Sequence, residues 1–157
     1  MNKNDAKKPG RKEIDEQVQR ILSSEHFANA DRISNFLKYV VECELSGEGW
    51  NLKGYNIGID VFEKPDDFNS DTDSSVRVEA TRLRRALSLY YYQEGCFDPI
   101  VITIPKGGYR PSIFYNPETV DLKRMIFRHT KMQIAIYALL VSVFVGVCVL
   151  ASTYYPY

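Results

Sequence analysis

The sequence has few of the residues that build metal centres and disulfide frameworks. It contains three cysteines (Cys43, Cys96 and Cys148) and two histidines (His26 and His129). The cysteines are odd in number and none is spaced as a metal ligand, so we expect a reducing compartment without structural disulfides. Neither histidine has the neighbours of a zinc site. The sequence therefore predicts no metal and no cofactor.

The sequence also lacks the motifs of common enzyme classes. It has no glycine-rich phosphate loop, no nucleophile elbow and no paired-carboxylate site, so we do not expect an enzyme. The loop 65–75 has alternating residues of the kind found in calcium loops: Asp67, Asn69, Asp71 and Asp73. Its sixth position is Thr72 rather than glycine and its twelfth is Val78 rather than glutamate, so we do not expect a calcium site there. We expect Asp73 to cap a following helix instead.

The charges balance overall but are segregated along the chain. There are 20 basic and 20 acidic residues. Residues 25–73 carry four basic and eleven acidic residues, whereas residues 74–131 carry ten basic and five acidic ones. This segregation is typical of a protein whose second half faces nucleic acid or anionic lipid.

Apolar residues at helical spacing predict four helices. They are expected at 13–24, from Asp31 (with Asp31 or Asn29 as the cap) to Ser46, at 52–62 with Asn51 as the cap, and at 75–92. A short β-hairpin is expected next, with strands 100–104 and 109–113. Between them Lys106 lies beside Gly107 and Gly108, both of which are expected to supply the positive φ of a hairpin turn.

The helix 75–92 has two distinct faces. Its apolar face should enter the core and comprises Val76, Ala80, Leu83, Leu87 and Tyr90. Its other face is basic and hydroxylic and comprises Arg77, Thr81, Arg84 and Ser88, flanked by Arg85. The only acid before the last turn is Glu79, on the midline of neither face. Such a face suits an anion such as DNA, although the helix alone is equally compatible with a solvated basic surface.

The helix and hairpin together resemble the recognition helix and wing of the OmpR/PhoB-type winged-helix family. That family has the pattern Val-x-Val-His-Ile-x-x-Leu-Arg-x-Lys-Leu, then a strand, then Arg-Gly-x-Gly-Tyr-Arg. The matching residues are Val76, Val78, Leu83, Arg84, Leu87, Gly108, Tyr109 and Arg110. Two features depart from the family: Glu79 stands where a histidine is usual, and the N-terminal four-stranded sheet is absent.

The resemblance implies a mainly α fold with a C-terminal β-hairpin wing, a winged helix-turn-helix that binds double-stranded DNA. The implied DNA contacts are Arg77, Thr81, Arg82, Arg84 and Arg85 on the helix and Lys106 and Arg110 on the wing. The helical face adds Ser88 to this set. The family also implies contact between RNA polymerase and the loop 65–75, with Phe68 as an exposed anchor.

The segment 132–157 has no charged side chain. Residues 133–153 would form a helix about 31 Å long, enough to cross a bilayer. Basic residues flank it on the N-terminal side only: Lys123, Arg124, Arg128 and Lys131. The positive-inside rule then places the N-terminal domain in the cytoplasm. Small residues four apart, Ala138, Ser142 and Gly146, suggest a homodimer through this helix.

These patterns predict a single-pass protein of a bacterial inner membrane. Its expected parts are a disordered basic arm (1–12), a cytoplasmic winged-helix domain (13–115), a linker and basic juxtamembrane segment (116–132), a transmembrane helix (133–153) and a short non-cytoplasmic end (154–157).

The layout is similar to that of membrane-bound transcription regulators of the ToxR/CadC kind. Those regulators have a sensory domain beyond the membrane, which this layout lacks. A signal would therefore have to enter through a membrane protein partner, the membrane itself or dimerisation. The alternative is a membrane-tethered interaction module that binds an acidic protein or anionic lipid.

Overall fold

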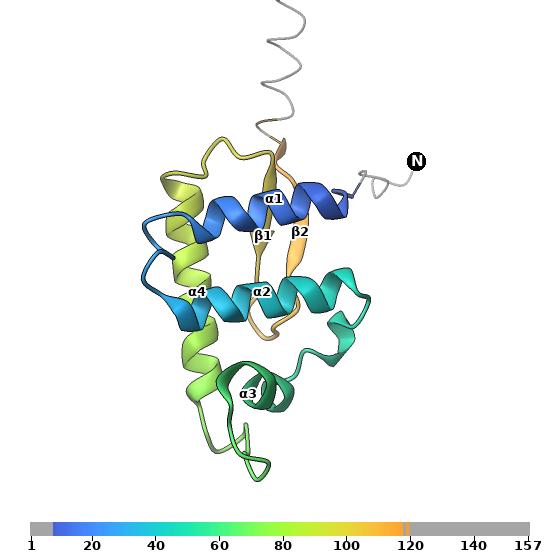
Figure 1. The fold of residues 1–157 in the computed structure, drawn as a ribbon, viewed down its shortest axis with the longest axis vertical. Helices are drawn as coiled ribbons and strands as arrows, with labels where there is room; N and C mark the ends of the chain where they lie inside the picture. Colours follow the sequence, from blue (N-terminus) through green and yellow to red (C-terminus); the bar gives the residue numbers. More distant parts are fainter. Residues whose placement is uncertain (1–7, 118, 120–157) are drawn as a thin grey trace, which may run out of the picture. The chain divides into compact units, whose positions relative to one another are not determined.

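The computed structural model describes residues 8–117 and 119, and it confirms a mainly helical chain with one small antiparallel sheet (Figure 1). The chain divides into two units, residues 1–116 and 117–157, and nearly all described residues belong to the first. Its elements, in order, are α1 (Arg11–Leu22), α2 (Asp31–Leu45), the short 3-10 helix η1 (Gly49–Asn51), α3 (Gly54–Phe62), α4 (Ser75–Tyr92), β1 (Ile100–Thr103) and β2 (Ser112–Tyr115).

The first and third helices begin at different residues from those expected. Helix α1 begins at Arg11 because the Glu13 carboxylate accepts the Gly10 backbone N–H at 2.9 Å, so the end of the expected basic arm is helical. Helix α3 begins at Gly54 after Lys53. Asn51 does not cap it, because Asn51 ends η1, where it accepts hydrogen bonds from the side chain of Asn56.

One hydrophobic core joins the helices to the sheet. The expected apolar face of α4 is confirmed, since Val76, Leu83 and Tyr90 are at most 3% exposed. This face packs against α2, α3 and β1. Phe36 and Ile102 are fully buried beside it. The opposite face of α4 is therefore the one presented to solvent.

The second strand of the hairpin begins later than expected, at Ser112 rather than at residue 109. Strand β1 pairs antiparallel with β2, with Ile100 opposite Tyr115 and Thr103 opposite Ser112. The connecting loop consequently spans residues 104–111, longer than the expected four-residue turn. Only one of its glycines has the expected positive φ: Gly107 has φ +88°, whereas Gly108 lies outside that region.

The loop between α3 and α4 does not expose the expected aromatic anchor. Phe68 is 8% exposed, and its ring lies against Gly58 and stacks near Tyr55 with ring centroids 6.5 Å apart. Burying an apolar ring is favourable in free energy, and Gly58 leaves room for the ring of Phe68. Phe68 is therefore a core residue, and the expectation of an exposed anchor was wrong.

Several expectations lie outside the described residues. They concern residues 1–7 of the arm, the juxtamembrane segment, the transmembrane helix 133–153 with its small residues Ala138, Ser142 and Gly146, and the end 154–157. Within the described ranges, 8–117 and 119, no helix has both the length and the apolar character needed to cross a membrane.

Candidate nucleic-acid interface

The solvent-exposed side of α4 carries cations and hydroxyls. Arg77, Thr81, Arg85 and Ser88 are exposed there, and we call these four residues the α4 face. The Thr81 hydroxyl donates to the Arg77 carbonyl oxygen at 2.9 Å, and the Ser88 hydroxyl donates to the Arg84 carbonyl oxygen at 2.8 Å. These bonds use the hydroxyl protons within the helix, so the two oxygens face outward as acceptors.

The only acid of the first four turns of α4 is removed from that surface. Glu79 is 7% exposed, and its Oε1 lies 3.2 Å from Arg82 Nη1 and 3.5 Å from Arg32 Nε. Two cations thus neutralise a nearly buried carboxylate. Glu79 is a structural residue, and Arg82, expected at the DNA, is held beside it.

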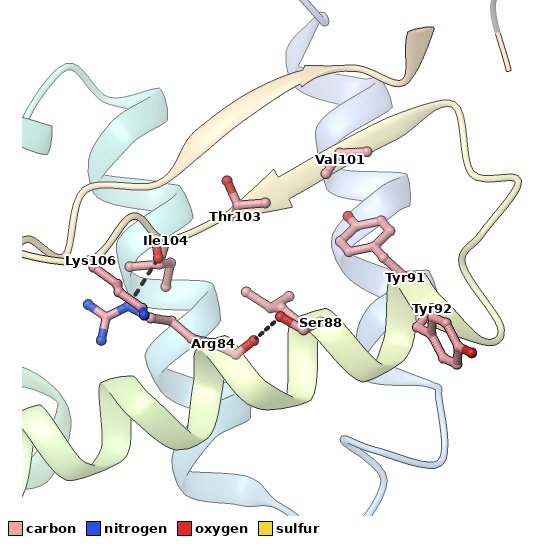
Figure 2. Close-up of a pocket in the computed structure, with 9 residues that line it drawn as sticks. Arg84, Ser88, Tyr91, Tyr92, Val101, Thr103, Ile104 and Lys106 are labelled. Carbon is pink, nitrogen blue, oxygen red and sulfur yellow. Dashed lines mark hydrogen bonds between the residues drawn. The ribbon is translucent and has the colours of Figure 1, made fainter. Parts of the chain in front are cut away.

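Arg84 fastens α4 to the hairpin loop. Its Nε donates to the Ile104 carbonyl oxygen at 3.0 Å, and its Nη2 donates to those of Pro105 and Gly108 at 3.2 and 2.8 Å. Figure 2 shows the bond to Ile104 between the helix and the loop. Three of the five guanidinium N–H groups are used in these hydrogen bonds within the protein. Arg84 therefore positions the hairpin, and mainly its Nη1 is left to contact a ligand.

Arg110, at the other end of the hairpin loop, is also occupied. Its guanidinium donates to both carboxylate oxygens of Glu44 on α2, at 2.7 and 3.0 Å. This bidentate pair raises the pKa of Arg110 and neutralises its charge locally. Lys106, by contrast, is exposed in the loop with no ion pair to any residue the structure describes.

A cleft of about 290 Å³ lies between the first half of α4 and the hairpin loop. Its lining brings together Arg77, Thr81 and Arg84 from the helix with Gly107 and Gly108 from the loop. Two guanidinium groups, a hydroxyl and two glycines without side chains around one hollow can accept an anionic group such as phosphate. The sequence-predicted residues are therefore split: Arg77, Thr81, Arg85, Ser88 and Lys106 are displayed, whereas Arg82, Arg84 and Arg110 are paired within the protein.

The N-cap of α4 is Ser74 rather than the expected Asp73, but Asp73 still accepts a hydrogen bond from the first residue of the helix. Asp73 Oδ1 accepts the Ser75 backbone N–H at 2.7 Å, and its other oxygen lies 2.9 Å from Lys64 Nζ. Lys64 and the Ser75 N–H lower the pKa of Asp73 to about 2. The Arg77 side chain also donates to the Asp71 carbonyl oxygen, at 3.3 Å. These contacts fix the end of α4 that faces the cleft.

One exposed residue of this surface is not among those predicted from the sequence. Val78, a match to the family pattern, is 46% exposed between Arg77 and the paired Arg82. Its position could have been found on the helical wheel, because residues two apart lie about 200° from one another and Val76 is buried.

Comparisons with known proteins give no assignment. No family model matches the chain, and neither a curated protein nor a solved structure shows significant similarity to it. Within the part of the chain that the structure describes, no cluster of three metal-ligating side chains occurs.

Proposed function

We propose that the chain is a membrane-anchored winged-helix transcriptional regulator that binds double-stranded DNA. The observation that carries the proposal is the composition of the exposed side of α4. It presents Arg77 and Arg85 with two hydroxyls, and its first four turns present no free carboxylate because Glu79 is buried in ion pairs. A surface helix without a DNA ligand would ordinarily mix both signs of charge.

In this proposal α4 is the recognition helix and the hairpin is the wing. The α4 face enters the major groove, which admits one helix, and Thr81 and Ser88 accept hydrogen bonds from base edges. Arg77 and Arg85 contact phosphates or guanines. Lys106 contacts the backbone beside the groove. Arg84 and Arg110 act through the fold, because their hydrogen bonds fix the wing against α4 and α2.

The same cations would also attract an acidic protein or anionic lipid. Dependence on base sequence separates these alternatives, because neither of those partners competes according to the sequence of a duplex. Salt dependence alone does not separate them, since every such contact weakens as salt is added.

The test uses residues 1–116, which form one compact unit and contain every buried residue of the hydrophobic core that the structure describes. The fragment is incubated with random-sequence duplexes at about 150 mM salt, and the retained DNA is sequenced. A double variant, Arg77→Ala with Arg85→Ala, runs beside a control, Lys12→Ala with Lys38→Ala, which removes equal charge from exposed sites on α1 and α2.

A shared sequence motif that is lost in the arginine variant and kept in the lysine variant is the expected result. Equal and unselective retention by both variants would refute DNA recognition by α4.

The membrane anchor rests on residues 133–153 and is tested separately. Full-length chain should remain with membranes after alkaline carbonate washing, whereas residues 1–116 should not. Release of the full chain into the wash would refute the anchor without affecting the proposal for α4.

A further inference from the structure

A second hollow, of about 580 Å³, lies between the C-terminal half of α4 and strand β1 (Figure 2). Its walls are mainly apolar and include Leu87 and Tyr91 from α4 and Val101 and Ile104 from the hairpin. We call it the α4–β1 groove. Its volume falls within the range of small-molecule sites, which are apolar with a few placed polar groups.

The backbone along this groove already has partners. The Tyr91 hydroxyl donates to the Ile100 carbonyl oxygen at 3.2 Å and accepts from the Ile102 N–H at 2.9 Å. Arg84 Nε donates a hydrogen bond to the Ile104 carbonyl oxygen at 3.0 Å. The edge of β1 is therefore capped by side chains, so an incoming peptide strand would not find the row of free N–H and C=O groups it needs. A guest gains chiefly by burying apolar surface.

Positive charge lies at one end of the groove. Figure 2 shows Arg84 and Lys106 at that end and Tyr91 and Tyr92 toward the other. Lys106 is exposed, and Arg84 keeps its Nη1 free of the bonds that Nε and Nη2 make to the hairpin loop. None of the nine residues that line the groove is acidic. The complementary guest is an apolar chain with an anionic group at one end.

We propose that the α4–β1 groove binds a single-chain aliphatic carboxylate. The carboxylate lies at Lys106 and Arg84 Nη1, and the chain runs along Leu87 and Val101 toward Tyr91. A neutral chain would leave the cationic end of the groove without a partner. A small polar anion would leave the apolar walls of the groove exposed to water.

The experiment titrates residues 1–116 with dodecanoate below its micelle-forming concentration and follows heat and backbone amide shifts. Dodecanol is the neutral probe. Lys106→Ala removes the cation, and Val101→Glu places a carboxylate on the half-buried wall. Lys38→Ala, on the exposed side of α2, is the matched control. Circular dichroism establishes that each variant is folded before it is titrated.

The expected result is saturable binding of one dodecanoate, with amide shifts centred on Tyr91 and Val101. Lys106→Ala should weaken dodecanoate binding about fivefold, the scale of one exposed charge pair. It should leave dodecanol unchanged. Val101→Glu should remove binding of both probes, and Lys38→Ala should change neither. Absence of saturable binding, an equal loss in Lys38→Ala, or equal affinity for dodecanoate and dodecanol would overturn the proposal.

Discussion

Arg84 Nη2 lies 2.8 Å from the carbonyl oxygen of Gly108, a residue 24 positions later in the chain. The same guanidinium reaches the carbonyl oxygens of Ile104 and Pro105. The Arg84 side chain thereby fixes the position of the hairpin loop relative to the α4 face. Arg84, which matches the family pattern and was expected to contact DNA, is in this structure the link between helix and hairpin.

Replacing Arg84 with lysine should weaken this link. A lysine ammonium is a point charge and cannot span three carbonyl oxygens with one planar group. We expect Arg84→Lys to lower the free energy of unfolding by about 1–3 kcal/mol, the scale of hydrogen bonds to charged groups. Urea unfolding of residues 1–116 measures this change.

The control is Arg85→Lys, because Arg85 is exposed one position away. It should change stability by less than about 0.5 kcal/mol. Equal effects at the two positions would show that the three hydrogen bonds of Arg84 contribute nothing specific.

Gly107 and Gly108 should respond differently to alanine. Gly107 has φ +88°, a conformation that costs an L-residue about 1–2 kcal/mol. A Cβ at Gly108 would meet open space, and its φ is not in that region. We expect Gly107→Ala to lower the free energy of unfolding by about 1 kcal/mol or more and Gly108→Ala to be nearly neutral. Thermal unfolding of the two variants compares them directly, and a neutral Gly107→Ala would contradict the turn geometry.

The elements that depend on local spacing could be predicted from the sequence. The buried face of α4 is an example, because Val76, Leu83 and Leu87 recur at the helical period whatever the rest of the chain does. The existence of the hairpin followed from β-branched residues around a glycine turn. Its register did not follow, because the loop is held from outside the hairpin by Arg84 on α4 and by Glu44 on α2, which pairs with Arg110.

The partners of the charged residues could not be predicted. Arg84, Arg82 and Arg110 look alike in the sequence as free cations, and each is paired in the structure with a group far away or on another turn. The pairings of Arg84 and Arg110 depend on how α2, α4 and the hairpin pack, whereas Arg82 pairs with Glu79 three positions away on the same helix. Phe68 was misassigned for the same reason, since its burial depends on the missing side chain at Gly58.

Gly58 should tolerate no side chain while Phe68 is present. A Cβ at Gly58 would overlap the buried Phe68 ring. Overpacking of this kind costs about 1–3 kcal/mol, more than the roughly 1 kcal/mol that alanine gains over glycine in a helix. We expect Gly58→Ala to destabilise the fold, as measured by urea unfolding. In the double variant with Phe68→Leu the added cost should be smaller than in the single variant, and strict additivity would contradict the contact.

The Asp73 carboxylate should make the stability of α4 depend on acid pH. Its pKa is lowered to about 2, first by the Lys64 hydrogen bond and then by the Ser75 N–H. A lowered pKa stabilises the folded state above the unfolded value of about 4 and loses this contribution as the pH falls toward 2.

The stability difference between the wild type and Asp73→Asn should therefore be largest near neutral pH and shrink between about pH 4 and pH 2. Asp67→Asn, an exposed acid of the same loop, serves as the comparison. The measurement is urea unfolding at a series of pH values. A difference that stays constant over that range would contradict the lowered pKa.

Glu79 connects the fold to the proposed DNA surface, because its carboxylate forms ion pairs with both Arg82 and Arg32. Glu79→Gln keeps the shape of the side chain and removes this charge. The fold should lose about 1 kcal/mol, since both arginines are largely exposed. DNA binding should become tighter at low salt, because Arg82 on α4 becomes an unpaired cation.

The slope of log affinity against log salt should steepen by about one phosphate contact. Glu16→Gln, an exposed acid on α1, controls for the change in net charge alone. Fluorescence anisotropy with a labelled duplex over a salt series measures both variants. If α4 faces the duplex, Glu79→Gln should raise affinity more than Glu16→Gln while lowering stability. The same small gain in both variants would mean that Arg82 is not near DNA and that α4 presents another side to it.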